Sequence, residues 1–193
     1  MRTEAGLVGV LALIAAVGAA APAEAQHQHH GGAQGEQAVS PYAGMQARSI
    51  KALSEQQMAD LRAGRGMGMA LAAELNGYPG PVHVLELADA LGLAPEQRRR
   101  IQALREAMTA KAVPLGERLI AEEAALDSEF AARTVTLASL EVATSAIGRT
   151  QAALRAAHLR YHLATVEVLT QAQVRRYGEL RGYRSADARR QGG

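Results

Sequence analysis

The stretch that decides the fold is residues 95–132, PEQRRRIQALREAMTAKAVPLGERLIAEEAALDSEFAA. Its apolar residues recur at steps of three and four, which places them on one face of an α-helix. They are Ile101, Leu104, Met108, Ala112, Leu115, Leu119, Leu126 and Phe130. We therefore expect one long helix over 95–132, bent at Pro114 because proline removes a backbone donor and crowds the preceding turn.

A second long helix is expected over residues 137–168, after a break at 133–136. Its inward stripe is Leu137, Leu140, Thr144, Ile147, Gln151, Leu154, His158, Tyr161, Thr165 and Val168. Shorter helices are expected over 54–75, over 81–91 and over 171–183, the first interrupted by glycines at 64, 66 and 68. The sequence thus predicts an all-α fold, a long bent antiparallel helical hairpin with short flanking helices. Because two such helices leave apolar surface uncovered in a monomer, we expect a homodimer or an open apolar cradle.

The composition agrees with helix packing. Hydrophobic residues make up 48% of the chain but aromatic residues only 3%, and there is no Cys or Trp. A core built from Leu, Ala, Ile, Val and Met favours helices over a β-sandwich. Without cysteine the fold has no disulfide, so its stability must come from packing.

The N-terminus has the pattern of a secretory signal. Arg2 is followed by an uncharged apolar run over residues 6–21 and by the small-x-small sequence Ala23-Glu24-Ala25. The run is shorter than the roughly 20 apolar residues of a spanning helix. We expect cleavage near Ala25 and a periplasmic mature protein without a membrane span.

The chain therefore divides into a signal peptide (1–25), a disordered His/Gln/Gly-rich leader (26–44), a helical domain (45–184) and a disordered tail (185–193). Removing residues 1–25 takes away Arg2, Glu4 and Glu24, which leaves 20 Lys and Arg against 17 Asp and Glu, a net charge of +3. This charge is too small to indicate a nucleic-acid partner.

Three expected helix starts share one pattern. It occurs as Leu53-Ser54-x-x-Gln57, as Leu93-Ala94-Pro95-x-Gln97 and as Leu169-Thr170-x-x-Gln173. In a capping box the Ser or Thr accepts from the third helical N–H, and the Gln reaches back to the cap. Ala94 lacks the hydroxyl, at a cost of about 1 kcal/mol, although Pro95 suits the first helical position.

This pattern, on either side of a long helical hairpin in a small exported chain, resembles the Leu-Thr-x-x-Gln family of periplasmic proteins. The family includes the Spy/CpxP refolding chaperones and their metal-responsive relatives of the ZraP and CnrX type. The stretch 64–81, GRGMGMALAAELNGYPGP, resembles a proteobacterial branch of periplasmic heavy-metal sensors or refolding chaperones. The resemblance covers residues 53–183.

The resemblance implies a hairpin that dimerises into a curved cradle and holds unfolded client proteins without ATP in the stress response. The alternative is a periplasmic sensor or resistance protein for Cu, Zn or Ni that modulates a signalling partner. No cofactor is required by the first function. No cysteine nucleophile, Gly-x-Ser-x-Gly, phosphate-binding loop or His-Glu-x-x-His is present, so we expect no enzymatic activity.

Histidines are the candidate metal ligands. His158 and His162 stand four apart, which puts both on one helix face and can place two imidazoles on one metal. The pair also matches the helical His-x-x-x-Met or His pair of CnrX-like sensors. Met67, Met69, Glu74 and His83 could complete that site across the hairpin. A separate candidate site is the cluster of His27, His29 and His30 in the leader, because imidazole suits Cu, Ni and Zn.

Overall fold

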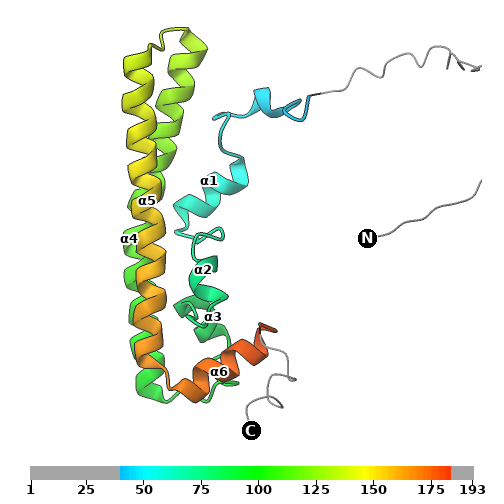
Figure 1. The fold of residues 1–193 in the computed structure, drawn as a ribbon, viewed down its shortest axis with the longest axis vertical. Coiled ribbons are helices and arrows are strands. Elements are labelled where there is room, and N and C mark those ends of the chain that lie inside the picture. Colours follow the sequence, from blue (N-terminus) through cyan, green and yellow to red (C-terminus); the bar gives the residue numbers. More distant parts are fainter. Residues whose placement is uncertain (1–39, 184–193) are drawn as a thin grey trace, which may run out of the picture. The chain divides into compact units, whose positions relative to one another are not determined.

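Two long helices dominate the structure, a computed structural model that describes residues 40–183. Helix α4 (Pro95–Ala132) and helix α5 (Leu137–Val168) lie side by side as an antiparallel hairpin (Figure 1). The shorter elements are η1 (Met45–Ala47), α1 (Glu55–Arg62), α2 (Leu71–Glu74), α3 (Pro81–Glu86) and α6 (Gln171–Leu180). The all-α hairpin with short flanking helices is confirmed, and α4 continues through Pro114.

The short helices pack along the hairpin. Helices α1 and α3 contact α4, and α2 contacts α5 (Figure 1). The first expected helix is broken, because α1 ends at Arg62 and Gly64 follows with φ +65°, a left-handed conformation that stops a helix. We call residues 64–80, which link α1 to α3 and include α2, the strap.

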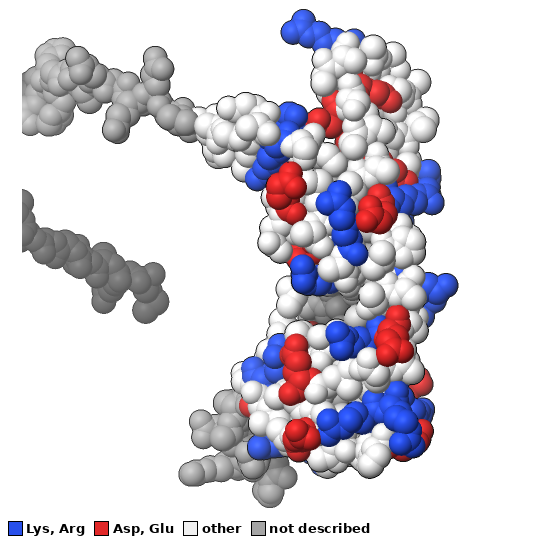
Figure 2. All heavy atoms as spheres, turned by 180° about the vertical axis from the view of Figure 1, so that it is seen from behind, with Lys and Arg blue, Asp and Glu red and all other residues white. Residues whose placement is uncertain are grey.

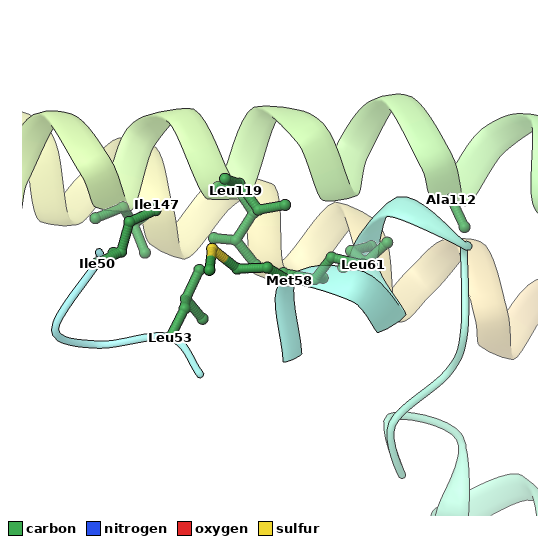
Figure 3. Close-up of a cluster of buried hydrophobic side chains, with 9 residues drawn as sticks. Ile50, Leu53, Met58, Leu61, Ala112, Leu119 and Ile147 are labelled. Carbon is green, nitrogen blue, oxygen red and sulfur yellow. The ribbon is translucent and has the colours of Figure 1, made fainter. Parts of the chain in front are cut away.

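Two apolar clusters hold these elements together. The first joins residues 50–53 and α1 to the middle of the hairpin, where Met58 and Leu61 meet Leu119 of α4 (Figure 3). The second lies at the root of the hairpin, where α4 begins and α5 ends. Its buried members are Val84, Ala88, Leu91, Leu93, Ile101, Val168, Leu169 and Tyr177.

Most residues of the predicted inward stripes are buried or half-buried, but Thr144 and Gln151 of α5 are exposed, contrary to the prediction, and so are the residues at the turn between α4 and α5. Phe130 and Leu137 are 54% and 80% exposed, and Val142 nearby is also exposed. No described element covers this end of the hairpin (Figure 1). We call Phe130, Leu137 and Val142 the tip.

Charged side chains are spread over the described surface. On the face shown in Figure 2, basic and acidic residues alternate with uncharged surface. Many form exposed pairs, such as Arg62 with Glu117 and Lys51 with Asp127, and pairs of this kind contribute little stability. Between residues 40 and 183, no helix has the length and apolar character needed to cross a membrane.

One glycine sets how closely α1 can approach α4. A methyl group on Gly116 would lie 2.4 Å from the carbonyl oxygen of Leu61. Leu61 is buried in the first cluster, and a backbone carbonyl cannot rotate away as a side chain can. Gly148, by contrast, lies on α5 with open space where its methyl group would be.

These two helical glycines give a matched pair of substitutions. We expect Gly116→Ala to lower the free energy of unfolding by about 1–3 kcal/mol, because α1 must move. Gly148→Ala should raise it by roughly 0.5–1 kcal/mol, because alanine suits a helix interior better. Urea denaturation monitored by circular dichroism measures both, and an unchanged or raised stability in Gly116→Ala would contradict the close contact.

Candidate functional site

The helix-start motifs form as predicted at two of the three sites. At α1, the Ser54 hydroxyl accepts from the Gln57 N–H at 3.1 Å, and the Gln57 side chain accepts from the Ser54 N–H at 2.9 Å. Thr170 and Gln173 make the same box at α6. At α4 only half of the box exists, because Ala94 has no hydroxyl, and Gln97 accepts from the Ala94 N–H at 3.1 Å.

The two later glutamines also bind each other. The Gln97 amide nitrogen donates to the Gln173 side-chain oxygen at 2.9 Å, and the Gln173 nitrogen donates back at 3.0 Å. Each nitrogen donates once more, from Gln97 to the Val168 carbonyl at 2.8 Å and from Gln173 to the Leu91 carbonyl at 3.4 Å. With the caps counted, every donor and acceptor of both amides is used.

This reciprocal amide pair links the starts of α4 and α6 to the end of α5. Leu93 and Leu169, the leucines of the same two motifs, are buried in the root cluster. Gln57 has no such partner among its hydrogen bonds and serves only its own helix start. Three copies that look alike in sequence therefore have two different roles.

The histidine pair on α5 is buried. His158 and His162 are 2% and 7% exposed. The Nδ1 of His162 lies 2.6 Å from the Tyr78 carbonyl oxygen, which only accepts, so Nδ1 carries the proton and donates. The Nε2 of His158 has no hydrogen-bond partner.

The strap lies against these two rings through glycine. A methyl group on Gly80 would be 2.8 Å from both Cε1 and Nε2 of His162. One on Gly66 would be 3.5 Å from Nδ1 of His158. At Gly80 the strap can lie this close to α5 only because there is no side chain, whereas at Gly66 a methyl group would make ordinary van der Waals contact with His158.

Glu74, at the end of α2, lies beside the pair and is the buried carboxylate of the described region, 7% exposed. Its Oε1 accepts from the hydroxyls of Tyr177 and, at 3.2 Å, Tyr183. Its Oε2 accepts from the Gly80 N–H at 3.2 Å and lies 3.7 Å from Nδ1 of His162. Burial, with the Glu74 carboxylate beside it, raises the pKa of Tyr177 well above its ordinary value.

Glu74 is poorly placed as a metal ligand, because both of its oxygens are already hydrogen-bonded and a metal would compete for them. The Nδ1 of His162 donates to a carbonyl, which leaves Nε2 as the ring nitrogen that a metal could use. Within residues 40–183 no three His, Cys, Asp or Glu residues gather in an arrangement that could hold a metal ion. His158 and His162 alone provide fewer ligands than the three or four of a zinc site.

The other metal candidates pack or pair elsewhere, are exposed, or lie outside the described residues. His83 on α3 pairs with Glu86 at 2.9 Å. Met69 packs against the first apolar cluster, and Met67 is exposed. His27, His29 and His30 of the leader, like the signal peptide, lie outside the described residues.

Sequence reasoning missed Tyr177 and Tyr183 as partners of Glu74, and it considered Glu74 only as a metal ligand. The one sequence feature that could have indicated a buried Glu74 is that it stands alone between Ala73 and Leu75 in a segment with few charges. The capping box of Thr136 and Ser139 at the start of α5 was also missed, because serine replaces glutamine as its third helical residue.

Comparisons of the chain with family models, curated proteins and solved structures found no match.

The amide pair can be tested without disturbing the caps. Glutamate serves a capping box as well as glutamine, but Gln173→Glu would bring oxygen against oxygen at Gln97. We expect Gln173→Glu to lower the free energy of unfolding by about 1–3 kcal/mol, while the matched Gln57→Glu changes it by less than about 0.5 kcal/mol. Equal effects in denaturant titrations would show that the pair contributes nothing beyond capping.

His158 should make stability depend on pH. Burial, and then the neighbouring charge of His162, lowers the pKa of His158 below its ordinary 6.5. The unfolded chain then binds this proton more readily, so the stabilising contribution is complete above pH 6.5 and is lost as the pH falls toward the lowered pKa. Denaturant titrations between pH 7.5 and 5 should show a slope that is smaller in His158→Gln, and an identical slope would refute this assignment.

Proposed function

We propose that the protein is an exported holding protein of the Leu-Thr-x-x-Gln type, which binds unfolded polypeptides without ATP. The observation that carries the proposal is the distribution of exposed apolar side chains. Of the ten large apolar residues exposed in the described part, seven fall within two short segments, 67–78 and 130–142. The second segment contains the three residues of the tip. The first contains Met67, Leu71, Leu75 and Tyr78 of the strap, which we call the ridge.

Clustered exposed apolar residues are typical of binding surfaces. Full burial of a large apolar side chain gains about 1.5–3 kcal/mol. Because Phe130, Leu137 and Val142 are 54%, 80% and 69% exposed, their full burial would together gain roughly 3–6 kcal/mol. That gain is close to the cost of about 4 kcal/mol or more for association. The tip alone would therefore bind a client weakly. A client that contacts both the tip and the ridge would bind more tightly and could still dissociate without ATP.

The sequence supports the setting of this function. The signal pattern at residues 1–25 and the lack of cysteine suit a periplasmic protein whose stability comes from packing. The joined motif glutamines give the Leu-Thr-x-x-Gln pattern a physical role, in keeping with the resemblance. A homodimer is part of the proposal, because pairing would bring two tips and two ridges to one client.

The test is suppression of client aggregation. The mature protein should lower light scattering from a chemically unfolded model enzyme on dilution, at near-stoichiometric ratio. The triple variant Phe130→Ser, Leu137→Ser, Val142→Ser should need severalfold more protein for the same effect. The control carries Ala107→Ser, Ala110→Ser and Ala125→Ser, exposed α4 residues outside both segments. A wild-type protein without effect, or a control as impaired as the tip variant, would overturn the proposal.

Metal sensing is the second candidate, and the observation that favours it is the unpartnered, buried Nε2 of His158. The same assay separates the two functions when it is repeated with Zn²⁺ or Cu²⁺. A metal effect that disappears in His158→Ala, His162→Ala would assign a metal role to the pair. An effect that persists there but disappears when residues 27–30 are deleted would assign it to the leader.

A further inference from the structure

The buried carboxylate of Glu74 collects contacts from three parts of the chain. It belongs to α2 in the strap and accepts from Gly80 at the end of the strap. From the C-terminal side it accepts hydrogen bonds from Tyr177 in α6 and from Tyr183 just beyond it. On the α5 side it faces His162.

A carboxylate buried without partners costs several kcal/mol, so these donors are needed to keep Glu74 inside. Arg181 adds a positive charge, with Nε 4.0 Å from Oε1. The guanidinium of Arg181 lies over the Tyr183 ring at 5.9 Å, and the rings of Tyr177 and Tyr183 meet edge to face at 6.4 Å. The end of α6 is therefore organised around an acidic group that belongs to the strap.

Packing also holds the strap, since Met69 packs against the first cluster and Ala73 and Pro79 are buried. Helix α2 is only four residues long and has no side-chain cap. Four of the strap's large apolar residues point outward as the ridge. Its specific contacts with α5 include those of Gly66 and Gly80 with the two imidazoles, the hydrogen bond from His162 to Tyr78, and the approach of Glu74 to His162.

We propose that Glu74 is a latch between the strap and α6, so that the two segments dock on the hairpin, and leave it, as one unit. If α6 detaches, Glu74 loses two phenol donors and its burial becomes unfavourable, which releases the strap. If the strap detaches, Tyr177 is left buried without an acceptor. The order of the ridge is thereby coupled to α6, about 100 residues away in sequence.

The latch adds a regulatory consequence that rests on the proposed function. A client bound at the ridge of a docked strap would favour docked α6, and anything that pulls on α6 would weaken client binding by the same factor, because such coupling is reciprocal. The latch itself can be measured without a client, so its failure and the failure of the holding function are distinct results.

The experiment is hydrogen exchange, followed by mass spectrometry, on the mature protein and its variant Tyr177→Phe. This variant keeps the ring in the root cluster and removes one donor to Glu74. We expect exchange in the strap, residues 64–80, to become faster by about tenfold or more, the effect of losing a hydrogen bond to a charged group, although the substitution is in α6. Exchange in the first cluster, around residues 112–120, should stay unchanged.

Two further variants complete the test. Glu74→Gln should speed exchange in residues 64–80 and 171–183 by similar factors. Glu86→Gln, which alters an exposed carboxylate paired only with His83, should change neither segment. Faster exchange confined to α6 in Tyr177→Phe, or no change in the strap, would overturn the latch. If Glu74→Gln does not fold, Tyr177→Phe alone decides.

Discussion

The reciprocal hydrogen bonds between Gln97 and Gln173 are the constraint on which the rest of the root depends. Two side-chain amides saturate each other and also satisfy two carbonyls and two helix-start N–H groups. These amides are partly buried, where a missing partner carries a cost, so each helix start stabilises the other. The start of α6 is thereby fixed against the start of α4 and the end of α5.

The amide pair positions α6, and α6 in turn positions the strap. Helix α6, which begins at the amide pair, directs Tyr177 into the root cluster with its hydroxyl on Glu74. Glu74 and Gly80 in turn keep the strap against His162. The ridge is the outer side of this same strap, whereas the tip lies at the end of the hairpin away from the root (Figure 1). One apolar surface thus depends on long-range polar contacts, and the other depends only on the two long helices.

The long helices could be predicted closely from sequence, since both α4 and α5 have the bounds that their periodicity and breaks indicate. The shorter ones were overextended: α3 ends at Glu86 rather than near 91, and α6 at Leu180 rather than near 183. Local patterns also found the cap glutamines and the histidine pair. They could not show that Gln97 meets Gln173, or that Glu74 meets Tyr177, because those contacts join residues 76 and 103 positions apart.

The contact between Gly80 and His162 also limits how this sequence can change over time. As long as a ring occupies position 162, no side chain fits at 80, and a larger residue at 80 becomes acceptable only after 162 has become smaller. Neither change is neutral alone. A smaller residue at 162 loses the hydrogen bond to Tyr78, and a larger residue at 80 displaces the strap. Among descendants of this sequence the two positions should therefore vary together, so that the three-dimensional contact leaves a trace in the pattern of substitutions.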